Sequence, residues 1–362
     1  MSVDRNVAVT VPFFSILLPT RNRSEIVGGA IESALSQTFT DFELIISDND
    51  TSNHATRDAV GQYSDSRIRY VRTNGNLSMH ENWENVFNQA TGRHCLVLED
   101  KLRLVPNALE ILHHYLEKHG DVVISYGVKF AKGPRLGPLE PWPKLRAYGS
   151  CEVIEMFCRF SQTFFQILPK ALDSCAPRAL LKDLQAKSPT GMLFSYIAPD
   201  YASAFQILGA VGGFFHVLDP LAYVPNNWMW QGKYSNGQAS YRKAESYKAC
   251  IASLPLTRDE ITRAVPIKSE FLWINLIIHD FLNLYRKPGH RPEIKWPSYY
   301  AFCLILLLFA RKAGGNLAEE AREIRALLQA QSIRFKLSVV CEFFAMGFGL
   351  LIRRIASHLP RR

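Results

Sequence analysis

Three short polar segments carry side chains suited to chemistry, and each comes directly after an apolar run. The runs are FFSILL at residues 13–18, FELIIS at 42–47 and HCLVL at 94–98. Carboxylates, amides and cations of this kind can hydrogen-bond a polar ligand, hold a divalent cation or balance phosphate charge. The segments that supply them are Pro19, Thr20, Arg21 and Asn22, then Asp48, Asn49 and Asp50, then Glu99, Asp100 and Lys101.

The elements that must position these segments are strands and helices in alternation. Continuous apolar runs of this length, ended by turn residues, predict buried strands. Further strands are predicted at 68–72 and 122–126, with helices between the strands. This order indicates βαβ units, and therefore an α/β fold with a Rossmann-type, mostly parallel sheet flanked by helices. Ligands of such sheets bind beyond the carboxyl ends of the strands, so the three polar segments should meet in one crevice.

The motifs of several common enzyme classes are missing from the sequence. It contains no G-x-G-x-x-G after the first strand and no G-x-x-x-x-G-K-[ST], which disfavours dinucleotide-binding and P-loop enzymes. It also contains neither H-E-x-x-H nor G-x-S-x-G, the signatures of zinc proteases and of α/β-hydrolases. The polar segments must therefore serve another chemistry.

Four segments together resemble the N-terminal half of the family-2 glycosyltransferases: SILLPTRNR, AIESALSQTFTDFELIISDND, NQATGRHCLVLED and the PNAL that begins at Pro106. The resemblance covers residues 13–112 and continues more weakly to about residue 237. It implies a GT-A fold, a nucleotide-sugar donor and inversion at the anomeric carbon. It also implies donor-binding roles for Pro19, Thr20, Arg21 and Asn22, which border the nucleotide, and for Asp48 and Asn49, which hold base and ribose.

The segment after the fourth strand departs from the family pattern. The family commonly has an acidic cluster there that holds a divalent cation, whereas this sequence has Asp100 followed by Lys101. A departing diphosphate needs positive charge, which Mg²⁺ or Mn²⁺ held by Glu99 and Asp100 would supply. Alternatively, the Lys101 ammonium stands beside the diphosphate in place of a metal. A third alternative is a decayed site.

Asp200 is the candidate general base. It follows a proline and begins an apolar helical run, in a P-D-Y-x-x-A segment similar to the acceptor-side aspartate segment of related family-2 sequences. A positioned carboxylate can take the proton of a sugar hydroxyl as that hydroxyl attacks. The alternative is an aspartate that only stabilises the helix start, and the two roles are compatible.

Residues 226–237, NNWMWQGKYSNG, are rich in aromatic and amide side chains. Aromatic faces and amides suit sugar rings, and glycine allows a loop to move. We therefore predict acceptor-binding roles for Trp228, Trp230 and Lys233. The alternative is an ordinary surface loop with packed tryptophans.

The C-terminal third is apolar and basic. The whole chain has 42 basic and 33 acidic residues, and residues 310–362 alone have ten basic and four acidic. Apolar helices are predicted at 270–285, 299–310 and 337–352, and the last two are too short to cross a bilayer core of about 30 Å. Basic residues flank 337–352, which suits a helix lying on an anionic membrane surface. The alternative is a helical subdomain that packs its apolar faces internally.

Cysteine usage and the N-terminus indicate the compartment. The sequence has seven cysteines, an odd number, and no two of them form a C-x-x-C pair. This disfavours a disulfide framework. The first residues contain no long apolar stretch, unlike a signal peptide. We expect a cytoplasmic protein, attached peripherally to the inner face of the cytoplasmic membrane if its basic C-terminal helices touch lipid.

These features predict three segments: a nucleotide-sugar-binding α/β half at 1–126, an acceptor-binding half at 127–240 and a helical, basic region at 241–362. The predicted function is sugar transfer from a nucleoside diphosphate sugar to an acceptor hydroxyl, on a glycan or a lipid-linked acceptor. Nucleic acid is not expected as a partner, because the basic residues cluster beside apolar helices. The alternative is a non-catalytic protein that binds nucleotide sugars.

Overall fold

The computed structural model describes residues 11–51, 54–131, 136–140, 142–194, 197–225, 236–254 and 256–356. The chain divides into two compact units, each made of three separate stretches. The first comprises Met1–Leu145, Ala171–Leu193 and Val217–Trp228. The second comprises Arg146–Lys170, Phe194–His216 and Met229–Arg362. Residues far apart in the sequence therefore belong to the same unit.

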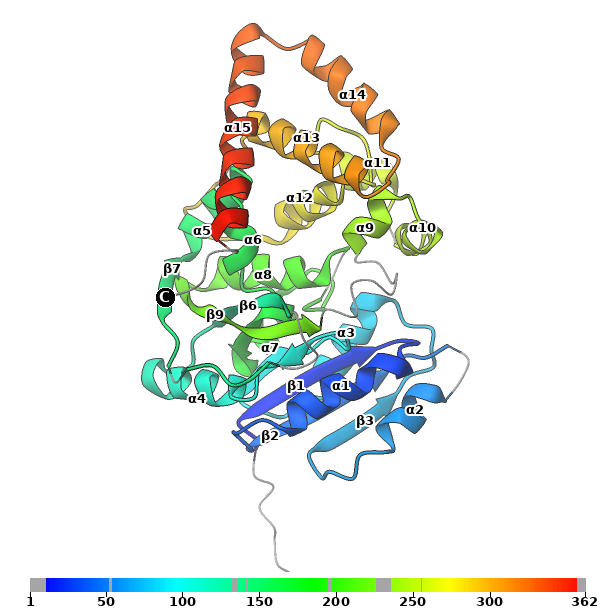
Figure 1. Cartoon of the computed structure of the whole chain (residues 1–362), viewed down its shortest axis with the longest axis vertical. Coiled ribbons are helices and arrows are strands. Elements are labelled where there is room, and N and C mark those ends of the chain that lie inside the picture. The colour runs from blue at the N-terminus through cyan, green and yellow to red at the C-terminus, as the bar shows by residue number, and fades with distance from the viewer. Residues whose placement is uncertain are drawn as a thin grey trace, which may run out of the picture. The chain divides into compact units, whose positions relative to one another are not determined.

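Four parallel strands begin the sheet. In the order β3-β2-β1-β4 they are Ile68–Arg72, Phe42–Asp48, Phe14–Thr20 and His94–Val97. β1 is buried along its whole length, as its continuous apolar sequence predicts for a strand covered on both faces. Figure 1 shows β1, β2 and β3 side by side at the blue end of the chain.

Beyond β4 the sheet continues through strands with antiparallel pairings. β8 (Ser174–Pro177) pairs antiparallel with both β4 and β6 (Ile124–Ala131), and β5 (Arg103–Leu104) pairs antiparallel with β9 (Gly213–Pro225). With β7 (Leu145–Gly149) beside β9, the described residues form a nine-stranded sheet. The prediction of a mostly parallel sheet flanked by helices is confirmed, with an antiparallel extension that hydrophobic periodicity does not reveal.

The helices of the first unit connect these strands. α1 buries the face formed by Val27, Ala30, Ile31 and Ala34. A capping box begins α3, where Ser78 and Glu81 satisfy each other's backbone N–H groups. The helices are α1 (Ser24–Leu35), α2 (Ala55–Val60), α3 (Met79–Asn88), α4 (Ala108–His119) and α7 (Arg178–Lys187), with a 3₁₀ turn at Ala171–Asp173.

The described part of the second unit is mainly helical, as predicted for the C-terminal region. An aromatic cluster forms part of its core: the ring centroids of Phe157 and Phe281 are 4.9 Å apart, and Phe205 lies 5.2 Å from each. The helices are α5 (Ser150–Cys158), α6 (Phe164–Ile167), α8 (Pro199–Ala210), α9 (Asn236–Tyr241), α10 (Glu245–Ala252), α11 (Arg258–Thr262), α12 (Trp273–Leu284), α13 (Trp296–Lys312), α14 (Ala318–Gln329) and α15 (Ile333–Ala356).

Helix α13 lies beside both α14 and α15, which are orange and red in Figure 1. Among the described residues, no helix combines the length and the apolar character needed to cross a bilayer. The short helices predicted at 299–310 and 337–352 correspond to α13 and α15. Both helices are longer than the apolar runs from which they were predicted.

Candidate functional site

The loops after β1, β2 and β4 meet at one edge of the sheet. Thr20 and Asp48 are register partners at the ends of β1 and β2. The Asn49 backbone N–H donates to the Thr20 carbonyl over 3.0 Å, and Thr20 Oγ1 donates to Asp100 Oδ2 over 3.0 Å. The three predicted polar segments are therefore adjacent in space, which is the arrangement that parallel strands impose on residues at their carboxyl ends.

Asp48 is completely buried and its carboxylate is almost fully hydrogen-bonded. Tyr70 OH and Arg72 Nη1 donate to Oδ2 over 2.5 and 3.0 Å, and the Asp50 backbone N–H donates to Oδ1 over 2.9 Å. Burial and the bond to Asp48 raise the pKa of Tyr70 to about 12, so this phenol stays a donor at neutral pH. Asp48 thus orients the Tyr70 phenol and the Arg72 guanidinium at this edge of the sheet.

Asn49 joins the loop after β2 to the loop after β3. Its Nδ2 donates to the Leu77 carbonyl over 2.7 Å, and its Oδ1 accepts from Thr73 Oγ1 over 2.6 Å. The Leu77 backbone N–H also donates to Oδ1, over 3.3 Å. Both amide atoms are therefore engaged within the protein, and a contact of Asn49 with a nucleobase remains a prediction.

The remaining residues of the first segment form a tight turn over the second. Pro19 is buried at the end of β1, whereas Arg21 and Asn22 are exposed. Asn22 has a φ of 53°, its backbone N–H donates to Asp50 Oδ1, and its Oδ1 accepts from the Thr51 backbone N–H over 3.1 Å. Asparagine tolerates this left-handed conformation better than most residues, which explains its place in the turn.

Asp100 is held by an ion pair inside the first unit. It is 3% exposed, and its Oδ1 lies 2.8 Å from Arg23 Nη1, while Oδ2 accepts from Thr20. Burial raises the pKa of Asp100, and the charge of Arg23 opposes that rise. The Arg23 side chain is 37% exposed, so a buried carboxylate holds a guanidinium that solvent can still reach.

Glu99 and Lys101 form a second ion pair in the same loop. Lys101 Nζ lies 2.8 Å from Glu99 Oε2, and the Glu99 charge raises the pKa of Lys101. The Lys101 side chain is 39% exposed. Two cations, Arg23 and Lys101, are thus attached to the two carboxylates that follow β4.

The residues after β4 do not fit a divalent cation as they are arranged. Such an ion is held by several oxygen ligands, usually including carboxylates. Here both Asp100 oxygens have donors, and the Glu99 carboxylate is paired with Lys101. Across the described ranges there is no group of three His, Cys, Asp or Glu side chains that could enclose a metal ion.

Asp200 lies in the first turn of α8, in the second unit. The chain before this turn is anchored by Asp280 of α12, whose Oδ2 accepts the Ala198 backbone N–H over 3.0 Å. Asp280 is completely buried, and His279 Nδ1 lies 3.1 Å from its Oδ1. Asp280 therefore fixes the start of the helix that carries Asp200, although it is 82 residues from Ala198.

Replacing Asp280 should loosen the start of α8. We expect Asp280→Ala to lower the free energy of unfolding by about 1–3 kcal/mol, because the partly buried Ala198 backbone N–H loses its acceptor. Asp280→Asn keeps an acceptor oxygen and should lose less. Urea unfolding measures both, with Asp259→Ala at an exposed helix start as the control. Equal stability of Asp280→Ala and the wild type would contradict the anchoring role.

The predicted acceptor residues Trp228, Trp230 and Lys233 lie outside the described residues. Three other side chains in the donor-side cluster, Arg23, Tyr70 and Arg72, were not predicted from the sequence. Arg72 ends β3, so the rule that directs attention to the ends of parallel strands could have found it. The pairing of Arg23 with Asp100 spans 77 residues and left no local signal.

Comparison with known sequences assigns part of the chain to a family. A sequence model of the family described as Glycosyl transferase family 2 matches residues 15–182, which include all three donor-side segments. Residues 15–182 belong to glycosyl transferase family 2. The family-2 domain thus contains the four parallel strands, and the predicted GT-A type of α/β fold is confirmed.

Curated relatives of the family-2 domain include two named for glucosyl transfer. One, from Campylobacter jejuni, is named GalNAc(5)-diNAcBac-PP-undecaprenol beta-1,3-glucosyltransferase and is 35% identical over 105 residues, 28% of this chain and 34% of the relative. The other, WfgD from Escherichia coli, is named UDP-Glc:alpha-D-GlcNAc-diphosphoundecaprenol beta-1,3-glucosyltransferase and is 30% identical over 113 residues, 31% of this chain and 44% of the relative. The match spans less than half the length of each of these two relatives.

One solved structure that aligns with this chain is Staphylococcus aureus TarS 1-349 in complex with UDP. It aligns with a TM-score of 0.48 at 15% identity and covers 88% of this chain and 92% of that chain.

Proposed function

We propose that the protein is a glycosyltransferase that moves a sugar from a nucleoside diphosphate sugar to an acceptor hydroxyl with inversion. The observation that carries the proposal is the meeting of Thr20, Asp48, Asn49 and Asp100 at the carboxyl edge of the sheet within a family-2 domain. Hydrogen-bonding and charged groups gathered at this edge suit a polar, phosphorylated ligand.

The proposed reaction is a single displacement. The acceptor oxygen forms a bond to the anomeric carbon while the bond from that carbon to the diphosphate oxygen breaks. The hydroxyl proton passes to the Asp200 carboxylate, and the nucleoside diphosphate leaves with the electron pair of the broken bond. On the donor side, Pro19, Thr20, Arg21, Asn22, Asp48 and Asn49 would hold the nucleoside and its phosphates. On the acceptor side, Trp228, Trp230 and Lys233 would contact the acceptor.

We further propose that Arg23 and Lys101 stabilise the departing diphosphate. Both side chains are partly exposed, and each is fixed by one carboxylate, Arg23 by Asp100 and Lys101 by Glu99. Fixed cations aimed at developing negative charge lower the barrier without reorganising during the reaction. The residues after β4 suit this role better than they suit binding of a divalent cation, because the Glu99 and Asp100 carboxylates are already paired with Lys101 and Arg23.

The acceptor is proposed to be a lipid-linked glycan of cell-surface polysaccharide synthesis. Two relatives of the family-2 domain are named for acceptors attached to undecaprenyl diphosphate. A lipid-linked acceptor requires the enzyme to work at a membrane surface, so we place the protein on the cytoplasmic face of the cytoplasmic membrane. The basic excess in residues 310–362 supports attraction to an anionic surface.

A donor screen tests the proposal. We expect a small set of nucleoside diphosphate sugars, with UDP-glucose among those tested, to raise the melting temperature of the purified protein, because ligands that bind the folded state stabilise it. Release of nucleoside diphosphate on adding lipid-linked oligosaccharides would demonstrate transfer. Donor binding without release across a broad acceptor panel would instead favour a non-catalytic nucleotide-sugar-binding protein. A protein that binds no nucleotide sugar would refute both.

A further inference from the structure

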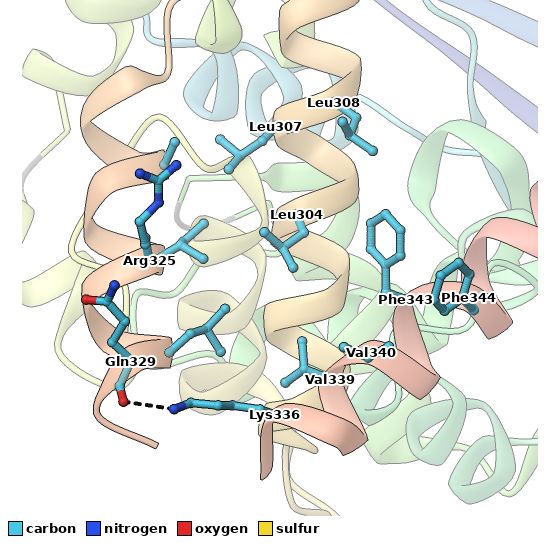
Figure 2. Close-up of a pocket in the computed structure, with 13 residues that line it drawn as sticks. Leu304, Leu307, Leu308, Arg325, Gln329, Lys336, Val339, Val340, Phe343 and Phe344 are labelled. Atoms are coloured by element: carbon cyan, nitrogen blue, oxygen red, sulfur yellow. Dashed lines mark hydrogen bonds between the residues drawn. The ribbon is translucent and has the colours of Figure 1, made fainter. Parts of the chain in front are cut away.

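Three helices of the second unit enclose an apolar groove of about 830 Å³. Leu304, Leu307 and Leu308 line it from α13, and Val340, Phe343 and Phe344 line it from α15, while α14 closes the third side. Figure 2 shows Leu304 and Leu307 projecting from α13 toward α14. The volume falls within the range of about 300–1,000 Å³ that is typical of ligand pockets.

An exposed apolar stripe on α15 leads into this groove. Ile333, Leu337, Val340 and Phe344 are 78%, 61%, 49% and 67% exposed. Their spacing of four, three and four residues places them on one face of the helix. Soluble monomers rarely leave a contiguous apolar surface of this kind uncovered, so the stripe marks an interaction surface.

The charged residues that line the groove are both basic. Arg325 lies on α14, and Lys336 lies on α15 with its Nζ donating to the Gln329 carbonyl over 2.9 Å (Figure 2). That hydrogen bond holds the ammonium at the edge of the groove. Apolar side chains bordered by cations match a lipid that has a hydrocarbon chain and an anionic headgroup.

We infer that this groove receives the hydrocarbon chain of an anionic membrane lipid. α15 then lies in the bilayer interface with its apolar stripe buried, and Arg325 and Lys336 face lipid phosphates. A second copy of the chain fits less well, because a symmetric contact through this face would bring like charges together. The inference rests on the proposed membrane location, and it names the groove between α13, α14 and α15 as the surface that binds the membrane.

Vesicle co-sedimentation of the full chain tests the inference. We expect strong binding to vesicles of phosphatidylglycerol and phosphatidylcholine, weak binding to phosphatidylcholine alone, and weaker binding as salt rises. Phe344→Gln removes an exposed apolar side chain without changing charge and should weaken binding about tenfold. Phe130→Gln is the matched control, because Phe130 is 61% exposed on β6 in the other unit, and it should bind like the wild type.

Two further measurements make the outcome decisive. Arg325→Gln and Lys336→Gln together should remove most of the preference for anionic vesicles, while thermal unfolding checks that each variant folds. Wild-type affinity in Phe344→Gln, or no vesicle binding by the wild type, would overturn the inference. Self-association that Phe344→Gln abolishes would also overturn it, in favour of a second copy. Because these assays contain no sugar donor, their failure leaves the transferase proposal standing.

Discussion

Asp200→Asn should slow sugar transfer by about 10²–10⁴-fold while leaving donor binding intact. A carboxylate that accepts the acceptor proton contributes about 10²–10⁴-fold to the rate, and an amide of the same shape cannot accept that proton. We therefore expect turnover to fall by about that factor, with the donor-induced rise in melting temperature unchanged. Nucleoside diphosphate release measures the rate, and titration of the donor in a thermal-shift assay measures binding.

The control for this variant is Asp259→Asn. Asp259 also lies in the first turn of a helix of the second unit, and it is exposed. Neutralising it removes the same charge from a similar helix position, so it separates base chemistry from helix-terminus electrostatics. Turnover in Asp200→Asn equal to that of Asp259→Asn would show that Asp200 only stabilises the start of α8.

Lys101→Met should slow transfer by about 10²–10³-fold, the usual cost of removing one group that stabilises developing negative charge. The wild-type rate should stay unchanged in excess chelator, because Arg23 and Lys101 supply the positive charge in our proposal. Steady-state turnover with and without EDTA measures both effects. Lys187→Met is the matched control, since Lys187 also pairs with a neighbouring carboxylate, at 2.6 Å from Asp183, away from the strand ends.

A divalent cation would produce the opposite pattern. Loss of wild-type activity in chelator, recovered by Mg²⁺ or Mn²⁺, would refute the assignment of Arg23 and Lys101. Lys101→Asp offers a second readout that does not depend on turnover. It replaces a cation by a third carboxylate beside Glu99 and Asp100, and we expect nucleoside diphosphate binding to become dependent on Mn²⁺.

The sequence by itself determined the framework on which the donor side is built. The apolar runs at β1, β2 and β4 predict buried parallel strands, because strands covered on both faces are apolar throughout. Asp48 and Asp100 stand just after two of those runs. Because the carboxyl ends of parallel strands lie at one edge of the sheet, the two residues are expected to lie close together. These are local patterns, and one sequence is enough to detect them.

Tertiary structure decided what the side chains at those positions contact. The ion pair between Arg23 and Asp100 spans 77 residues, and the bond from Ala198 to Asp280 spans 82. The antiparallel pairing of β5 with β9 likewise joins Leu104 to Ala222. Hydrophobic periodicity reports only whether a residue faces the core, whereas partners distant in the sequence are selected by packing of the whole unit. The sequence therefore predicts that Asp100 lies at the site, and only the tertiary structure shows that Arg23 is its ion-pair partner.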